Sequence, residues 1–451
     1  MNTLAITWAF AGWAAIALAL FALIGPRWAV WIALIGGYVV LPPGNYGAEG
    51  DALIFPFWII GGALPSDVWL SKAWAAPAIA ILGSVVFDRT RWATFRWRPE
   101  DWAMTAFCLW PLLQGFLLTD LRPNAVLSCA WLAVVWGVPY ILGRQYCADD
   151  GGVDRLAKVL AVAMLAVLPL AILEGVSSFR LHSVLLGDHP FAFDGNERYL
   201  AQRPQMMFEH GTLYGLWCAS AAVAAGWLAS TRVGRSRISW LAATALLVTM
   251  TLFAQSLAAI LLMIVGGVLA IVPNALRVVR WGLLPGGAMI IGIAAIHLSG
   301  IVPMRDLAEN TELGRQISGS LRTIGRGSFA WRIGQDLEAL AVLRDTLWFG
   351  SGRWDWFAAI NSRPWGLPLL ILGMYGMVAL TAIGIAIGAA YFTLVRLGSM
   401  REPNATAHSG RLGAAIVTMA AADAFLNSFV FLPAIVLFGA AGGLVDKASK
   451  P

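Results

Sequence analysis

Long runs of apolar residues recur along almost the whole of this 451-residue chain, and they constrain its fold more than any other feature. A helix needs about 20 mostly apolar residues to cross about 30 Å of hydrocarbon. Hydrophobic residues make up 59% of the sequence and charged residues 12%, whereas soluble domains are about 45–50% apolar and about 25% charged. The sequence therefore excludes a soluble enzyme and a disordered or fibrous chain, and it predicts an all-α polytopic membrane protein.

The apolar segments predict about 12–14 membrane spans. The clearer ones are Ala5–Ile24, Trp28–Leu41, Trp102–Thr119, Ala125–Leu142, Val159–Val176, His210–Ala229, Trp240–Ala254, Leu257–Val272, Gly282–Val302, Leu367–Val395 and Leu412–Leu426. The weaker ones, which are short or contain Pro, are Ala52–Leu64, Trp74–Phe87 and Phe429–Val445.

The arginines predict how the chain is oriented, because short loops rich in Arg and Lys stay in the cytoplasm. Such loops lie at 89–98, 232–237, 277–280 and 396–411, and they alternate consistently with the spans. With both termini inside, two long hydrophilic stretches fall outside. The net charge of +6 then orients the chain, and we expect no nucleic acid partner.

This orientation divides the sequence into five parts. They are N-terminal transmembrane helices at 1–176, a first periplasmic loop at 177–209, central helices at 210–302, a second periplasmic loop at 303–366 and C-terminal helices at 367–451. Within the second loop, apolar residues recur at helical spacing from Phe329 to Phe349. We expect an amphipathic helix there, lying on the outer surface and ending before Gly350 and Gly352.

Ionisable side chains meet the membrane boundary at the end of the first loop. Arg203 carries a planar, permanently charged group suited to phosphate, and Glu209 and His210 are proton acceptors of different strength. Tyr214, in the span that follows, is a candidate for substrate binding. The alternative is that Arg203 binds lipid headgroups and that Glu209 and His210 cap or solvate the start of the helix, where an acid is common.

A cationic patch lies in the second loop. Its arginines are Arg315, Arg322, Arg326 and Arg332, with no Asp or Glu between Leu313 and Gln335. Arg322 and Arg326 would share a face of a helix, and nearby glycines leave backbone amides free to approach an anion. Arg353 belongs to the same neighbourhood only by sequence. The alternative is a solvated surface, or one that binds lipid headgroups.

Other polar residues carry weaker signals. Glu174 and Asp423 lie within or near spans, where polar packing explains them more simply than ion transport does. His182, Asp188 and His189 cluster in the first loop without the spacing of metal ligands. We therefore expect no metal site.

Two segments resemble the family of O-antigen ligases and O-antigen polymerases, which are bacterial membrane glycosyltransferases. The segment from Arg203 to Gly215 is similar to the family's pattern of Arg, an aromatic residue, a polar pair and Gly at the start of a span. The segments Trp331–Gly352 and Leu369–Gly376 are similar to its arginine, its Gly-x-Gly and the helix after the loop. The resemblance covers roughly residues 177–397.

The resemblance implies a metal-independent enzyme, without cofactor, on the periplasmic face of the bacterial inner membrane. Its donor would be an undecaprenyl-pyrophosphate-linked glycan and its acceptor a second glycan, with polysaccharide assembly proteins as further partners. Arg203 and Arg332 would bind the pyrophosphate, and Glu209 or His210 would take the acceptor proton. Arg315, Arg322 and Arg326 would support the pyrophosphate or the glycan.

Three activities remain open. Ligases of this family usually carry a His-Asn pair near the end of the second loop, where this chain has Ser362, Arg363 and Pro364. A polymerase of O-antigen or exopolysaccharide repeat units is therefore favoured over a ligase that transfers glycan to a lipid A core. A lipid-linked glycan transporter or flippase is the main rival. Transporters place charged sites near the midplane, whereas the ionisable residues here gather in the two loops.

Overall fold

The computed structural model describes most of the bundle and parts of the two loops. The described residues are 3–44, 71–118, 122–177, 179–187, 189, 197–198, 201–272, 274–282, 310–323, 338–340, 342–343, 345–353, 356–357, 360, 364–400 and 404–448.

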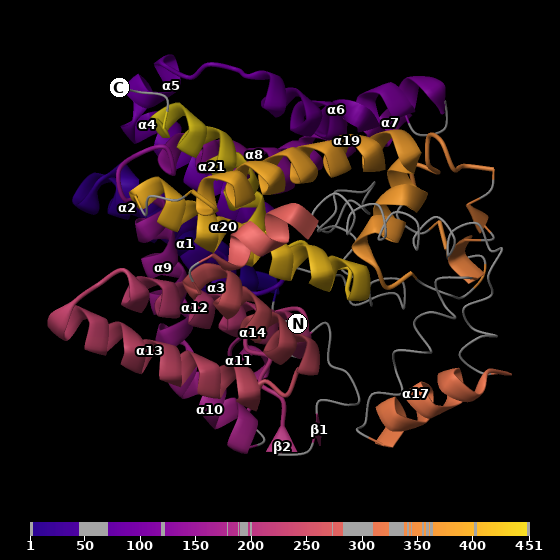
Figure 1. The fold of residues 1–451 in the computed structure, drawn as a ribbon. Helices are drawn as coiled ribbons and strands as arrows, with labels where there is room; N and C mark the ends of the chain where they lie inside the picture. The colour runs from indigo at the N-terminus through magenta and orange to yellow at the C-terminus, as the bar shows by residue number, and fades with distance from the viewer. Residues whose placement is uncertain are drawn as a thin grey trace.

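Helices dominate these residues, as Figure 1 shows. In the first part they are α1 (Thr3–Ile24), α2 (Pro26–Trp31), the π-helical turn η1 (Ile32–Gly36), α3 (Gly37–Val40), α4 (Lys72–Phe87), α5 (Arg89–Ala93), α6 (Pro99–Leu117), α7 (Arg122–Leu132), the π-helical turn η5 (Ala133–Gly137), α8 (Val138–Tyr146), α9 (Gly152–Ala166) and α10 (Leu168–Val176). Further along are α11 (Leu181–Leu186), α12 (Gly211–Ser230), α13 (Gly234–Phe253), α14 (Leu257–Ile271), α17 (Glu312–Thr323), α19 (Leu367–Gly398), α20 (Ala405–Leu426) and α21 (Leu432–Ala448).

The predicted all-α polytopic bundle is confirmed. Among the described residues, six helices are long and apolar enough to cross a membrane, and a bent pair would make a seventh. The six are Leu4–Ile24, Ala125–Tyr146, Gly152–Val176, Gly211–Ser230, Gly234–Phe253 and Leu367–Gly398. Pro26–Val40, Lys72–Phe87 and Leu432–Asp446 are shorter apolar helices. Two predicted spans fall outside the described residues, Ala52–Leu64 wholly and Gly282–Val302 except for its first residue.

The bundle has two chemically different ends. At the Glu209 end, the start of α4 meets the chain before α12, because Lys72 pairs with Glu209. At the Arg91 end, Arg91 joins Asp149 between α8 and α9, and Arg277 donates to the carbonyl of Ser399. The predicted cytoplasmic arginine loops thus gather at the Arg91 end, on the left of Figure 1. The positive-inside rule predicts that this end is cytoplasmic.

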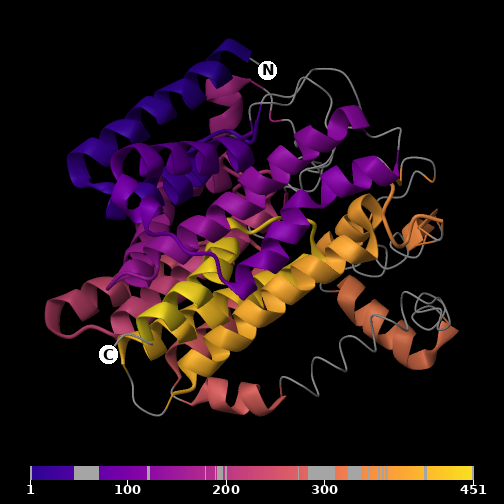
Figure 2. The same cartoon turned by 90° about the horizontal axis from the view of Figure 1, so that it is seen from above.

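The expectation that both termini lie on one side is wrong. Ile6 and Phe10 of α1 pack with Leu186 and Met207 at the Glu209 end. The other terminus follows α21, whose Asp446 pairs with Arg98 and Arg144 at the Arg91 end, and Figure 2 shows the two marks on opposite sides of the bundle. Hydropathy did not show whether the chain crosses the membrane an odd or an even number of times, because the short, Pro-containing segments made the number of spans ambiguous.

Small residues allow the central helices to approach closely, as is usual between membrane helices. A Cβ added at Gly143 of α8 would clash with the carbonyl of Val436 on α21, and one at Gly439 would clash with the carbonyl of Tyr140. The Gly- and Ala-rich helix α12 is buried along almost its whole length. It therefore forms the centre of the bundle, whereas α1 and α13 face outward along most of their surface.

The first predicted loop is partly folded into the bundle. After α11, strands β1 (Glu197–Arg198) and β2 (Ala201–Gln202) form an antiparallel pair in which Glu197 faces Gln202. The chain from Arg203 to Glu209 is then buried. This stretch is therefore a packed part of the fold rather than a solvated loop.

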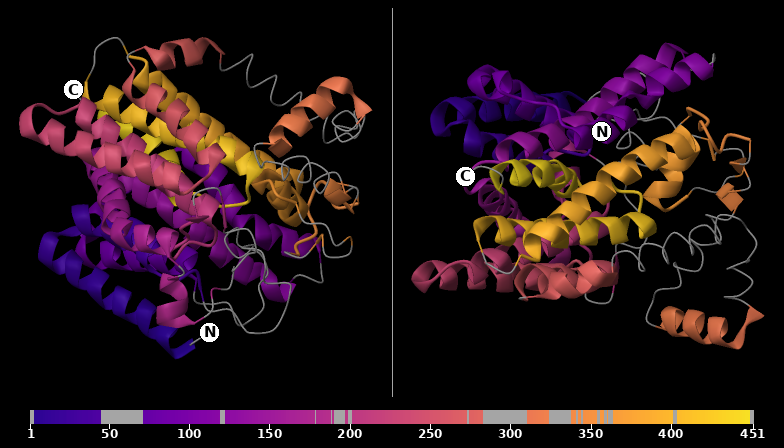
Figure 3. Two further views of the ribbon diagram at one scale, coloured as in Figure 1. Left: turned by 90° about the horizontal axis from the view of Figure 1, so that it is seen from below. Right: turned by 45° about the horizontal axis from the view of Figure 1, so that its top comes forward.

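In the second predicted loop, helix α17 stands apart from the bundle (Figure 1, Figure 3). The amphipathic helix expected from Phe329 to Phe349 lies largely outside the described residues, since 324–337, 341 and 344 are not described. Of its described residues, 338–340 and 342 are helical, as predicted, and 345–349 form turns.

Candidate functional site

A buried ion pair lies at the Glu209 end. The Nζ of Lys72 is 3.3 Å from the Oε2 of Glu209, and the two side chains are 0% and 1% exposed. The same ammonium donates a hydrogen bond of 2.7 Å to the carbonyl of Met207. Since a charge without a partner is very unfavourable in such a place, this pair ties the start of α4 to the chain before α12.

Aromatic rings complete the environment of Lys72. Its Nζ lies 4.4 Å from the ring centroid of Tyr38 and 4.5 Å from that of Phe208. Tyr38 in turn stacks on Trp217 of α12, with centroids 5.0 Å apart. The ammonium therefore gains cation–π attraction in addition to its ion pair, and the cluster joins α3, α4 and α12.

Arg203 is held inside the same end. It is 2% exposed, its Nη2 donates to the carbonyl of Gln255 at 3.1 Å, and its Nη1 donates to the hydroxyl of Thr212 at 3.3 Å. The aliphatic part of Arg203 packs over Gly211, where an added Cβ would clash with it. The guanidinium is thus positioned at the start of α12 by both the α13–α14 connection and α12 itself.

His210 caps α12. Its Nδ1 accepts a hydrogen bond of 3.0 Å from the backbone N–H of Thr212, which satisfies one of the donors left over at a helix start. A neutral ring in this arrangement carries its proton on Nε2. Tyr214 lies one turn further along and is fully buried against Phe208, so it is part of the core rather than of an exposed binding surface.

Glu174 fixes the course of the chain between Arg203 and Glu209. One of its carboxylate oxygens accepts the backbone N–H groups of Gln205 and Met206, both at 2.6 Å, and the other accepts that of Leu181 at 3.3 Å. Met206 adopts a positive φ of 56°, a conformation with a cost for such a residue. Polar packing of Glu174, as expected from the sequence, is confirmed.

His189 lies beside this chain, outside the spans. Its Nε2 is 3.1 Å from the carbonyl of Phe208, and its ring contacts that of His182 at 4.6 Å. Burial lowers the pKa of His189 well below the usual value, and the nearby His182 and Lys72 lower it further. His189 is therefore neutral in the folded protein near pH 7.

The two parts of the Gly-containing motif meet in space. The backbone N–H of Ser351 donates to the carbonyl of Gly373, and that of Gly352 donates to the carbonyl of Met374, each at 2.9 Å. Gly376 interrupts α19 with φ 79° and ψ 179°. A Cβ added at Gly350 would clash with the backbone at Gly376, and one added at Gly376 would clash with the backbone at Gly350. Both positions therefore need Gly, for positive φ and for close approach.

Gln114 of α6 completes the backbone pairing. Its Nε2 donates to the carbonyls of Phe349 and Met374, both at 2.7 Å. Irregular backbone at this depth requires such partners, since lipid supplies none. The side chain thus stabilises the break in α19 and the segment that docks there.

The start of α12 and the start of α19 both lie near the place where α20 ends and the connection to α21 begins. The ring of Phe429 in this connection stacks with His210, at 6.0 Å between centroids. On its other side, a Cβ at Gly366 would lie 3.2 Å from the carbonyl of Phe425. The start of α12 and the start of α19 therefore lie at the same end of the bundle.

Two arginines of the second loop, Arg315 and Arg353, have described side chains, and both are exposed. Arg315 is exposed on α17 and pairs with Glu312 at 3.0 Å, and the backbone of Arg322 lies on the same helix. Arg326 and Arg332 are outside the described residues. Arg353 is exposed next to Gly352, and its N–H donates to the hydroxyl of Ser351 at 3.1 Å.

Lys72 is the residue that the sequence reasoning missed. It stands alone at the edge of the weak span Trp74–Phe87, and a charged residue beside an apolar segment is itself a signal of function or pairing. Its partner is far away in the sequence, so the pattern alone could not identify Glu209. Among the described residues, no group of three or more His, Cys, Asp or Glu is arranged to hold a metal ion.

Comparison with models of protein families gives no match, and comparison with curated protein sequences gives none. The fold and composition define the class, which is a polytopic helical membrane protein.

Proposed function

We propose that this chain is a membrane glycosyltransferase that joins undecaprenyl-pyrophosphate-linked oligosaccharide repeat units, as a polymerase of O-antigen or exopolysaccharide does. The observation that supports it best is that the two motif segments lie at the same end of the bundle, the Glu209 end. The guanidinium of Arg203, the imidazole of His210 and the carboxylate of Glu209 lie at this end. The Gly350–Gly352 segment lies there too.

The proposed reaction needs an anion-stabilising group and a base. The acceptor hydroxyl attacks the anomeric carbon of the donor, the bond from that carbon to the phosphate oxygen breaks, and undecaprenyl pyrophosphate leaves with the electron pair. Arg203 would stabilise its developing charge, together with Arg332. A preorganised hydrogen-bond donor directed at developing negative charge stabilises a transition state by about 2.7–4 kcal/mol. A positioned general base raises the rate by about 10²–10⁴.

Of the two candidate bases, the geometry favours Glu209. The Nδ1 of His210 is occupied as a cap, so its other nitrogen is a donor in the neutral ring. The carboxylate of Glu209 does not cap the helix and lies 3.3 Å from the ammonium of Lys72. Because Glu209 is buried, the proposal requires the chain from Arg203 to Glu209 to move when the acceptor binds.

A complemented deletion strain tests the proposal. Arg203→Lys keeps a cation but loses the planar fork, and we expect polymer to be lost and single lipid-linked repeats to accumulate. Arg237→Lys, exposed at the other end of the bundle, is the matched control and should behave as wild type. Normal polymer from the Arg203→Lys and Glu209→Gln proteins, at normal expression, would refute the assignment.

The same experiment separates the related activities. Long chains that are not attached to lipid A would indicate the ligase, with glycan transfer to a lipid A core. Purified protein that lengthens lipid-linked oligosaccharide without nucleotide sugar would establish polymerisation directly, and a scaffold subunit would not do so.

A lipid-linked glycan flippase is the second candidate, and the broken helix α19 favours it. Transporters commonly use discontinuous membrane helices around their binding sites, and Gly376 interrupts α19 within its length. Repeats that accumulate on the cytoplasmic leaflet in the deletion strain would support this candidate over the polymerase.

A further inference from the structure

An arginine-lined recess of about 1160 Å³ opens at the Arg91 end, opposite the proposed reaction site. It lies between α2, α5, α8, α9 and the end of α21. Its charged lining consists of six arginines, which are Arg27, Arg91, Arg96, Arg98, Arg144 and Arg155, against the three aspartates Asp88, Asp149 and Asp446. The lining itself has three more arginines than aspartates, and two further acids, Asp101 and Glu100, pair with Arg144 and Arg98 from beside it. Counting these two acids, the recess keeps one excess positive charge.

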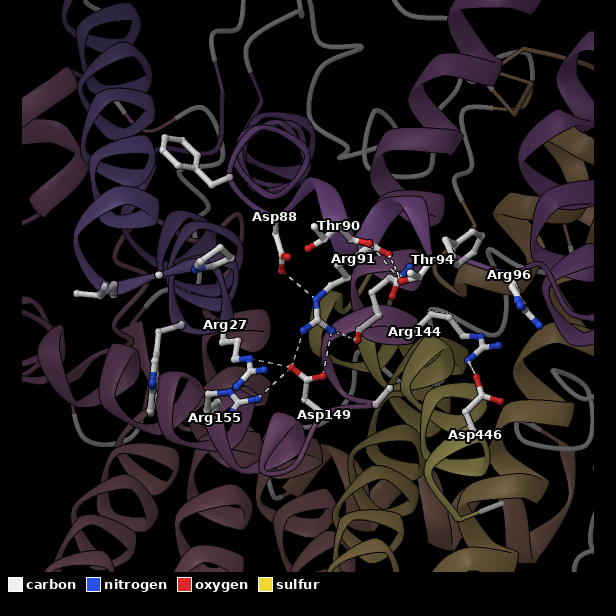
Figure 4. Close-up of a pocket in the computed structure, with 18 of the residues that line it drawn as sticks. Arg27, Asp88, Thr90, Arg91, Thr94, Arg96, Arg144, Asp149, Arg155 and Asp446 are labelled. Atoms are coloured by element: carbon white, nitrogen blue, oxygen red, sulfur yellow. Dashed lines mark hydrogen bonds and ion pairs between the residues drawn. The ribbon is translucent and has the colours of Figure 1, made fainter. Parts of the chain in front are cut away.

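The aspartates are shared, which leaves the cations only partly neutralised. Figure 4 shows Arg27, Arg91 and Arg155 around the single carboxylate of Asp149. Asp446 likewise serves both Arg144 and Arg98. Each guanidinium has five N–H donors, so one carboxylate cannot satisfy three of them.

Several donors in the recess have no acceptor among the described residues. The Nε and Nη2 of Arg155 and the Nε2 of Gln145 are buried without a hydrogen bond there, and Arg155 Nη2 is 3.7 Å from Asp149, too far for a hydrogen bond. Arg96 is exposed and forms no ion pair within the part of the chain that the structure describes. Buried donors without acceptors are costly, so they point to an oxygen-rich anion as ligand.

One wall of the same recess is apolar and faces outward. Ile24, Trp28 and Phe87, at adjoining ends of α1, α2 and α4, line it and are 45%, 37% and 44% exposed. Trp is enriched at the level of lipid headgroups. A ligand that fits both walls has an anionic phosphate group and an attached apolar chain.

We propose that this recess binds the phosphodiester headgroup of an anionic phospholipid from the leaflet at the Arg91 end, with its acyl chains along α1 and α4. A free phosphate shares the headgroup's chemistry but would leave most of the volume and the apolar wall unused. Basic pockets between membrane helices are known to hold such headgroups. The site is separate from the proposed glycan chemistry and does not depend on it.

Native mass spectrometry of the full chain, released from nanodiscs of phosphatidylglycerol, cardiolipin or phosphatidylcholine, tests the proposal. We expect at least one anionic lipid to stay bound and phosphatidylcholine not to replace it. Arg27→Gln combined with Arg96→Gln alters two exposed side chains and should weaken lipid binding about 25-fold, at about fivefold for each basic residue near the surface. Arg155→Gln should weaken it about fivefold.

The matched control is Arg235→Gln combined with Arg237→Gln, two exposed arginines of α13 that do not line the recess. Equal lipid retention by the recess variants and this control would overturn the proposal. So would displacement of the lipid by millimolar inorganic phosphate, which would identify a free phosphate site. Normal polymer synthesis by the Arg203→Lys and Glu209→Gln proteins, with lipid binding intact, would count against the proposed function and not against this site.

Discussion

Replacing one member of the Lys72–Glu209 pair should lower the free energy of unfolding far more than replacing both. At 3.3 Å and an effective dielectric of about 20, the two charges attract by about 5 kcal/mol. The desolvation of both ions largely offsets this attraction. Each single variant, Lys72→Met or Glu209→Gln, leaves one buried charge without its partner, and we expect a cost of about 3–5 kcal/mol in the free energy of unfolding.

The double variant should cost only about 1–3 kcal/mol, because no buried charge is left and the carbonyl of Met207 merely loses its donor. The coupling between the two sites is then at least about 3 kcal/mol. Denaturant titration in mild detergent, followed by Trp fluorescence, measures it, since Trp217 stacks on Tyr38 beside the pair. Lys158→Met is the control, because its pair with Asp154 is partly exposed and should be worth less than about 1 kcal/mol.

Two results would refute this reasoning. One is a loss below about 1 kcal/mol in both single variants, which would mean that water reaches the pair. The other is a double variant whose loss equals the sum of the single losses, which would mean that the two charges do not interact.

Three further predictions follow from the packing. Gly376→Ala should lower the free energy of unfolding by more than about 2 kcal/mol, because the residue has φ 79° and no room for a Cβ, whereas Gly384→Ala, with open space around it, should be neutral in the same titration. Gln114→Leu should cost about 1–3 kcal/mol, chiefly for the carbonyl of Phe349, since the carbonyl of Met374 keeps the N–H of Gly352 as a donor, and a thermal midpoint equal to that of wild type would contradict this. Because the pKa of His189 is lowered in the fold, the unfolded chain binds a proton more readily, so the free energy of unfolding should fall as the pH drops below about 6.5. His189→Asn should flatten this pH dependence. An unchanged slope would mean that another group causes it.

The sequence predicted the class and much of the organisation. Apolar segments long enough to span the bilayer left no other fold class, and the arginine loops correctly indicated which connections share an end. The Gly-x-Gly at 350–352 and the helix up to Gly376 were singled out as parts of one motif, and they do contact each other. These features are local, so pattern and composition can reveal them.

Other features depended on residues that are distant in the chain. The two termini lie at opposite ends because the number of crossings is odd, and the weak hydropathy signals of the short segments do not determine that number. The burial of Arg203 and Glu209 could not be foreseen, since a hydrophilic stretch before a span is usually solvated, and here Glu174 and Lys72 draw it into the bundle. The recess at the Arg91 end likewise combines α2, α5, α8, α9 and α21.

By itself, the sequence determined that this chain forms a helical bundle in a bilayer, because the free energy of burying an apolar segment depends on the residues of that segment alone. Only the tertiary structure decided which charges are paired and which remain available to a ligand. That choice depends on side chains brought within a few ångströms by packing, and sequence spacing carries no information on such distances.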